Sequence, residues 1–95
     1  PAAPAAEPTL EELAQQREFA AAEALLVAGV ASAAWSTSST LAVALRGPVD
    51  EQRRAEILRE VCARVVARDA LRFTRLQVET LGEAGPTAPR WFPCR

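Results

Sequence analysis

The feature that most constrains this chain is a run of twenty-two uncharged residues, from Ala24 to Leu45. A run of this length could cross a bilayer as a helix, or it could be buried inside a globular domain. Five consecutive hydroxyl residues, Ser36 to Thr40, lie in its middle, where a membrane span is most apolar, and alanine, which adds little to insertion, supplies seven positions. We therefore expect a helix end, a polar turn and a buried strand within 24–45, with a single-span membrane subunit as the less favoured alternative.

A helix is predicted before this run. Thr9 is followed three residues later by Glu12, which is the pattern of a capping box at a helix start. Apolar residues then recur at helical spacing from Leu10 onward. The helix is expected to end near Gly29, with continuation towards Trp35 as the alternative.

A strand is predicted from Thr40 to Arg46, where leucine and valine alternate with alanine. Both faces of this segment are apolar, as in a strand that is covered on both sides. Gly47-Pro48 then marks a turn, and Asp50 can cap a following helix.

The segment after Asp50 has one apolar helical face. At 100° per residue, that face comprises Ile57, Leu58, Val61, Cys62, Val65 and Val66. The helical pattern breaks near Asp69, and from Leu71 the apolar residues alternate, with a phase slip at Arg75 that a β-bulge could absorb. We therefore predict a helix to Asp69 and a strand over 71–80, with an unbroken helix to Leu81 as the alternative.

Together these elements predict an α+β fold in the order helix, strand, helix, strand, with a β-α-β unit; the alternative is an all-α two-helix hairpin. Residues 1–8 are expected to form a Pro/Ala arm, 9–81 a single small domain, and 82–95 an irregular tail anchored by Trp91 and Phe92. Because the sequence begins with proline rather than methionine, we expect a processed or partial chain.

The residue types exclude most catalytic sites within this chain. It contains no histidine, and all eleven of its basic residues are arginine, so neither a Ser–His nor a Ser–Lys pair can form. Its four glycines match no phosphate-binding loop, and Glu56 and Glu60 alternate with arginines as a solvated ion-pair face does. We expect no enzymatic activity, no cofactor and no metal from this chain alone. Ten arginines against seven acids in residues 46–95 are too balanced to predict nucleic-acid binding.

The two cysteines are far apart in the sequence. Cys62 lies among apolar residues of the second predicted helix, where a buried free thiol is the default, and Cys94 lies in the proline-rich tail. A Cys62–Cys94 disulfide is the alternative, since the sequence does not decide between the two states.

Two segments resemble the opening strand and helix of nonribosomal peptide synthetase condensation domains. Residues 45–50, LRGPVD, resemble the family's LRGPLD; residues 68–72, RDALR, resemble its RHEALR; and residues 14–19, AQQREF, are similar to its AQRxxW. The histidine of the second motif is missing, and the family's HHxxxDG active-site motif is absent. The resemblance implies an N-terminal structural piece of an acyl-transfer domain, without a catalytic residue.

The function predicted from the sequence is that of a non-catalytic accessory or scaffold subunit that contacts other protein chains in a larger complex. The candidate partner contacts are aromatic and arginine side chains: Trp35, Arg68, Arg72, Arg75, Trp91 and Phe92. Membrane contact through 24–45 is the less favoured alternative.

Overall fold

The computed structural model describes residues 8–82 and 85–94. It contains two long helices, α1 (Leu10–Leu25) and α2 (Glu51–Val66), and a short 3₁₀ turn, η1 (Asp69–Leu71). Its strands are β1 (Val30–Trp35), β2 (Thr40–Arg46), β3 (Arg75–Gly82), β4 (Gly85–Pro86) and β5 (Arg90–Pro93). The predicted Pro/Ala arm, 1–8, lies almost wholly outside the described residues.

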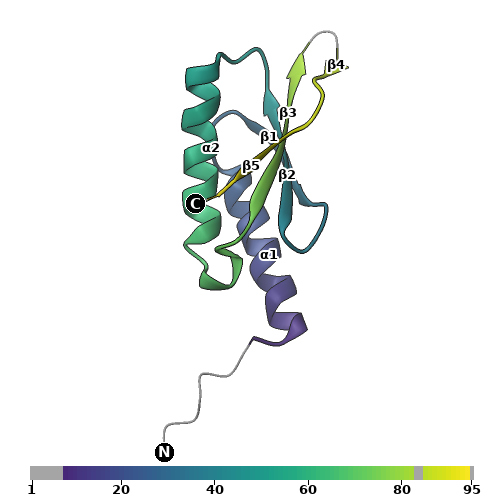
Figure 1. Cartoon of the computed structure of the whole chain (residues 1–95), viewed down its shortest axis with the longest axis vertical. Helices are drawn as coiled ribbons and strands as arrows, with labels where there is room; N and C mark the ends of the chain where they lie inside the picture. The colour runs from purple at the N-terminus through teal and green to yellow at the C-terminus, as the bar shows by residue number, and fades with distance from the viewer. Residues whose placement is uncertain (1–7, 83–84, 95) are drawn as a thin grey trace, which may run out of the picture.

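The strands form one mixed sheet beside the two helices (Figure 1). β1 and β2 form an antiparallel hairpin, and β2 pairs in parallel with β3, with α2 as the crossover. β4 and β5 both pair antiparallel with β3. The α+β prediction and its β-α-β unit are therefore confirmed.

The core lies between one face of the sheet and the helices. β2 contributes Leu41, Val43 and Leu45, and α2 contributes Ile57, Val61 and Val65, all almost completely buried. From α1 only alanines are fully buried, Ala20 and Ala24, and their small size allows that helix to pack closely.

Both predicted helix starts are confirmed. The Thr9 hydroxyl accepts a hydrogen bond from the Glu12 backbone N–H at 3.1 Å, and the Asp50 carboxylate accepts one from the Arg53 N–H at 2.7 Å. Each cap satisfies a backbone donor that has no partner inside its helix.

The predicted helix ends require correction. The first helix ends at Leu25, before a turn in which Gly29 has φ +96°, a conformation that favours glycine. The residues that follow form β1, which the sequence analysis missed. The second helix ends at Val66, and the chain passes through η1 before β3 begins at Arg75. The β2–β3 register is continuous from Thr40↔Arg75 to Arg46↔Leu81, so the β-bulge expected at Arg75 is absent from this pairing.

The predicted turn at Gly47-Pro48 joins β2 to α2, across a cis peptide bond. A Cβ on Gly47 would collide with the carbonyl oxygen of Leu81 in β3. Only glycine therefore allows the ends of these two parallel strands to approach each other here.

The structure also corrects two expectations about the end of the chain. The tail, 82–95, was expected to be irregular, yet it contains β4 and β5. Cys62 was expected to be a free thiol, yet it forms a disulfide with Cys94, with the two Cα atoms 5.2 Å apart.

The uncharged run 24–45 forms the end of α1, the β1–β2 hairpin and its hydroxyl-rich turn. Within the described part of the chain, no helix has the length and apolar character needed to cross a bilayer.

Candidate partner-binding groove

The three candidate arginines do not lie on one helix, because α2 ends before the first of them. Arg68 joins α2 to α1: its guanidinium donates to Gln16 Oε1 at 2.6 Å and to Glu23 Oε1 at 3.1 Å. The same guanidinium lies 5.4 Å from the centroid of the Phe19 ring. Arg68 therefore has a structural role, holding the first helix against the end of the second.

Arg72 and Arg75 also have partners within the chain. Arg72 forms an ion pair with Asp69 at 3.0 Å and lies over the exposed ring of Phe73. Arg75 donates from Nε to the buried hydroxyl of Thr40 at 2.8 Å. Both arginines are exposed, and the side chain of Arg75, the first residue of β3, connects that strand to β2.

The three candidate aromatic residues are also separated. Trp35 is half-buried against the core, and its indole N–H donates to the Arg17 carbonyl at 2.7 Å. Trp91 is 53% exposed and lies opposite Gln77, on the face of the sheet that the helices leave uncovered. Phe92 points to the helix side, where it packs against the core.

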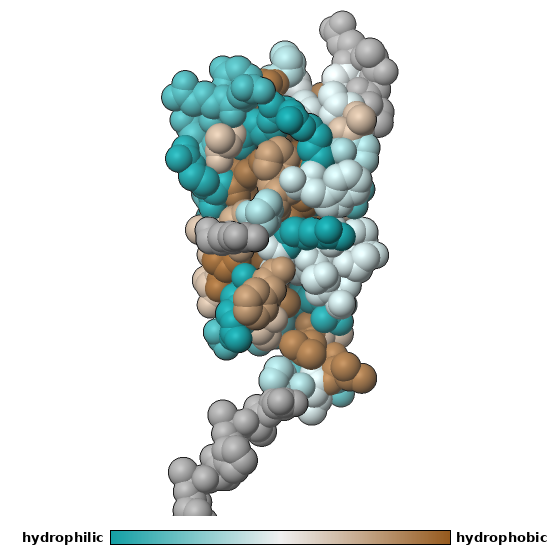
Figure 2. Space-filling model, viewed as in Figure 1, coloured by the Kyte–Doolittle hydropathy of each residue, from teal (hydrophilic) through white to brown (hydrophobic). Residues whose placement is uncertain are grey.

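Phe92 forms part of a groove of about 610 Å³ between α2 and β5, which we call the α2–β5 groove. One wall is α2, and the other is β5 with Arg90, Phe92 and Pro93. Figure 2 shows hydrophobic residues, in brown, between the hydrophilic residues at upper left, where α2 lies in Figure 1, and the paler residues towards the right, where the strands lie.

The α2 wall spans the whole helix. Its residues follow the helical series i, i+3, i+4, i+7 and its continuation: Glu51, Arg54, Ala55, Leu58, Arg59, Cys62, Ala63 and Val66. This spacing places them along one stripe of the helix, which we call the second stripe of α2 to distinguish it from the core face. The stripe lies beside the core face of α2 and shares Leu58 with it, and the half-buried Cys62 and Val66 of the stripe also pack against the core.

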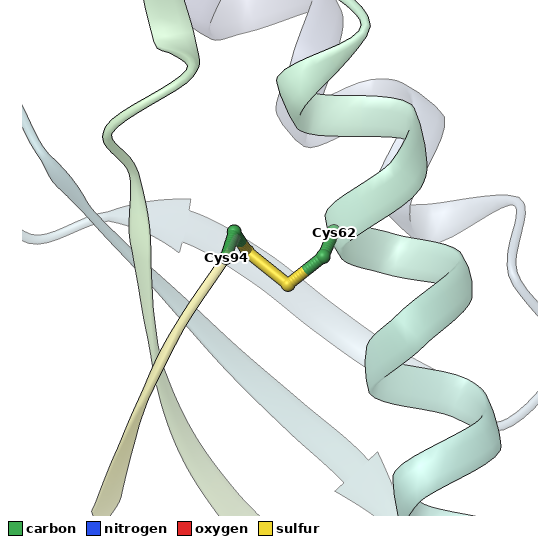
Figure 3. The surroundings of a disulfide bond; sticks show 2 residues. All are labelled: Cys62 and Cys94. Carbon is green, nitrogen blue, oxygen red and sulfur yellow. A yellow bond between two sulfur atoms is a disulfide. The ribbon is translucent and has the colours of Figure 1, made fainter.

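The disulfide connects the two walls. Figure 3 shows Cys62 on α2 bonded to Cys94, immediately after the end of β5. Cys94 is 3% exposed, and its backbone N–H also donates to the Thr74 carbonyl. The end of β5 is thus held at a fixed distance from the helix, which maintains the groove between them.

The groove has a basic rim. Arg54, Arg59 and Arg90 line it together with one acid, Glu51. Glu51 is paired with Arg54 at 3.6 Å, whereas Arg59 and Arg90 form no ion pair with any described residue. The rim therefore carries more positive than negative charge.

The lining of the groove combines apolar and charged side chains. It consists of alanine, larger apolar side chains, arginine, one glutamate and a disulfide-bonded cysteine. In the part of the chain described by the structure, no group of three or more histidine, cysteine, aspartate or glutamate side chains could hold a metal ion.

No protein-family model, no curated protein and no solved structure matches this chain. The resemblance to condensation domains therefore stays a prediction that rests on the quoted sequence segments.

Of the predicted contact residues, only Phe92 lines the α2–β5 groove. The sequence analysis missed Ala55, Arg59 and Ala63, although the three- and four-residue spacing of the second stripe could have revealed them. It could not have revealed Arg90 or Pro93, because nothing local to the tail predicts that it forms a strand opposite α2.

Proposed function

We propose that this chain is a non-catalytic accessory subunit that binds a segment of another protein in the α2–β5 groove. The observation that supports the proposal is the combination of a mainly apolar lining, a basic rim and a covalent connection between the walls. Grooves with these features bind by burying apolar side chains, while charged groups at the edge provide specificity and orientation.

The disulfide favours such a role because it reduces the freedom of the binding surface. Without it, the four-residue β5 would be held by its pairing with β3, by the packing of Phe92 and by the backbone hydrogen bond from Cys94 to Thr74. A wall that is ordered before binding lowers the entropic cost of association.

A formed disulfide also favours an oxidising compartment as the place of action, since thiols in reducing compartments stay reduced. Alkylation of the protein from its source cells under denaturing conditions, which expose the buried Cys94, followed by mass spectrometry, tests this point. We expect Cys62 and Cys94 to resist alkylation until a reductant is added; immediate alkylation of both would contradict it.

Co-purification with matched variants tests the proposed function. Ala55→Glu places a carboxylate in the groove, and Ala14→Glu places the same side chain at an exposed position of α1. We expect a partner protein to be retained by the wild type and by Ala14→Glu, and to be lost with Ala55→Glu. The same pattern must recur when the purified partner is mixed with each variant.

Equal retention by both variants would show that binding does not use the groove. Circular dichroism of both proteins provides the folding control. We expect both spectra to match that of the wild type, because glutamate is a good helix former and both sites are exposed.

A further inference from the structure

We propose, building on the function above, that the segment bound in the α2–β5 groove is an amphipathic α-helix with acidic residues flanking its apolar face. The inference rests on the second stripe of α2, because a pocket for a small or irregular ligand would not need lining residues along the whole helix. Here the stripe continues from Glu51 to Val66.

The dimensions of the stripe fit a helix. The sixteen residues of α2 extend about 24 Å at 1.5 Å per residue, so a partner of about four turns would contact its full length. Ala55 and Ala63 are exposed and small, and they leave space for the apolar side chains of a second helix at an interaxial distance of about 8–10 Å. Phe92 and Pro93 then form the opposite wall, on the β5 side.

An extended segment fits this groove less well. A strand would have to pair with β5, which has only four residues, Arg90–Pro93. Pro93 has no backbone N–H to donate to a neighbouring strand. Strand addition, which obtains its affinity from main-chain hydrogen bonds, therefore has little available edge here.

The rim determines the charge of the partner helix. Arg54, Arg59 and Arg90 line the groove beside its apolar residues, and guanidinium groups bind carboxylates through paired hydrogen bonds. A second copy of this chain is disfavoured as the occupant, because a two-fold dimer through the groove would bring arginine rims together. A partner helix with glutamate or aspartate beside its apolar stripe provides the complementary charge.

The test uses three fluorescent sixteen-residue peptides and anisotropy measurements. The first has leucine at i, i+3, i+4 and i+7 positions with glutamate elsewhere. The second has lysine in place of glutamate, and the third is the first with a central proline, which prevents a continuous helix. We expect the acidic helical peptide to bind at least tenfold more tightly than either control, and to lose this advantage against Ala55→Glu.

Each other outcome overturns the inference and can be distinguished from failure of the proposed function. Equal binding of the proline peptide would indicate an extended occupant, and equal binding of the lysine peptide would remove the role of the rim; in both cases loss with Ala55→Glu would keep the groove as the binding site. Absence of binding by all three, together with partner retention unaffected by Ala55→Glu, would reject both proposals. Sedimentation that shows dimers dissociated by Ala55→Glu would identify a second copy as the occupant.

Discussion

Two adjacent faces of α2 differ in what covers them. The core face contributes Ile57, Val61 and Val65, which are at most 1% exposed against the sheet and α1. The second stripe, on the next face around the helix, contains the exposed alanines Ala55 and Ala63 and the half-buried Val66. The same helix therefore has one apolar face that the domain fills and one that it leaves partly open.

Under the proposed function, the two faces of α2 have different roles, stability for one and binding for the other. Branched aliphatic residues fill space and stabilise the fold, because each buried methylene-sized group contributes about 0.8 kcal/mol. Alanines and arginines stabilise the fold little at a half-open face, but they leave space and charge for a second molecule. Variants on the two faces should accordingly separate stability from binding.

Removal of the disulfide should have the largest effect, because it changes both the stability and the groove. The cysteines are thirty-two residues apart, and closing a loop of this size stabilises a fold by about 3–4 kcal/mol in the chain-entropy model. We expect the double variant Cys62→Ala/Cys94→Ala to lose about that much free energy of unfolding in urea and to bind the acidic peptide more weakly. Undiminished peptide affinity would show that the groove does not depend on the covalent connection.

A matched pair of valines tests the comparison itself. Val61 is 0% exposed on the core face, whereas Val66 is half-buried on the second stripe. We expect Val61→Ala to lower the free energy of unfolding by about 2–3 kcal/mol and Val66→Ala by about 1 kcal/mol or less. Val66→Ala should weaken peptide binding more than Val61→Ala does. Equal losses of stability would mean that both faces belong to one core.

The helix cap should affect both faces together. The Asp50 carboxylate accepts a hydrogen bond from the Arg53 N–H at 2.7 Å. We expect Asp50→Ala to lower the free energy of unfolding by about 1 kcal/mol, the usual cost of losing such a cap. Asp50→Asn, which keeps an acceptor oxygen, should restore most of this stability in thermal unfolding. If Asp50→Ala lowered the free energy of unfolding much more than Val61→Ala does, Asp50 would have a structural role beyond capping.

The solvent-facing side of α2 should give the smallest effect. Arg53 and Glu56 form an ion pair at 3.3 Å, with about half of each side chain exposed, and pairs of this kind contribute at most about 0.5 kcal/mol. Arg53→Ala/Glu56→Ala should leave peptide affinity unchanged. A loss of affinity would move the binding surface from the groove to this side of the helix.

The sequence predicts those elements of the fold that are marked by local signals, such as capping residues and apolar alternation. Thr9 and Asp50 mark the helix starts, and the alternation of leucine and valine from Leu41 to Leu45 marks β2. β1 was missed because its alternating residues are mostly alanine and serine, which give no contrast between its faces. β5 was missed because it is four residues long and next to prolines, and its position depends on pairing with the distant β3.

The candidate site was predictable only in part, because one of its walls depends on contacts between residues that are distant in the sequence. The second stripe of α2 can be found from spacing alone, since Ala55, Arg59 and Ala63 follow helical intervals. The opposite wall requires the Cys62–Cys94 bond and the β3–β5 register, both of which depend on tertiary structure. The aromatic pair at the tail illustrates this limit, because adjacent residues of a strand point to opposite faces and only Phe92 enters the groove.

The most direct test of the account is to map the bound acidic peptide on the protein by NMR amide shifts. We predict that the largest changes fall on Ala55, Arg59, Ala63 and Val66 of α2 and on Phe92 of β5. Ser32 and Ala34, on the sheet face away from the helices, should stay unchanged. Changes centred on that open sheet face, with none along α2, would contradict the claim that the second stripe of α2 is a binding surface.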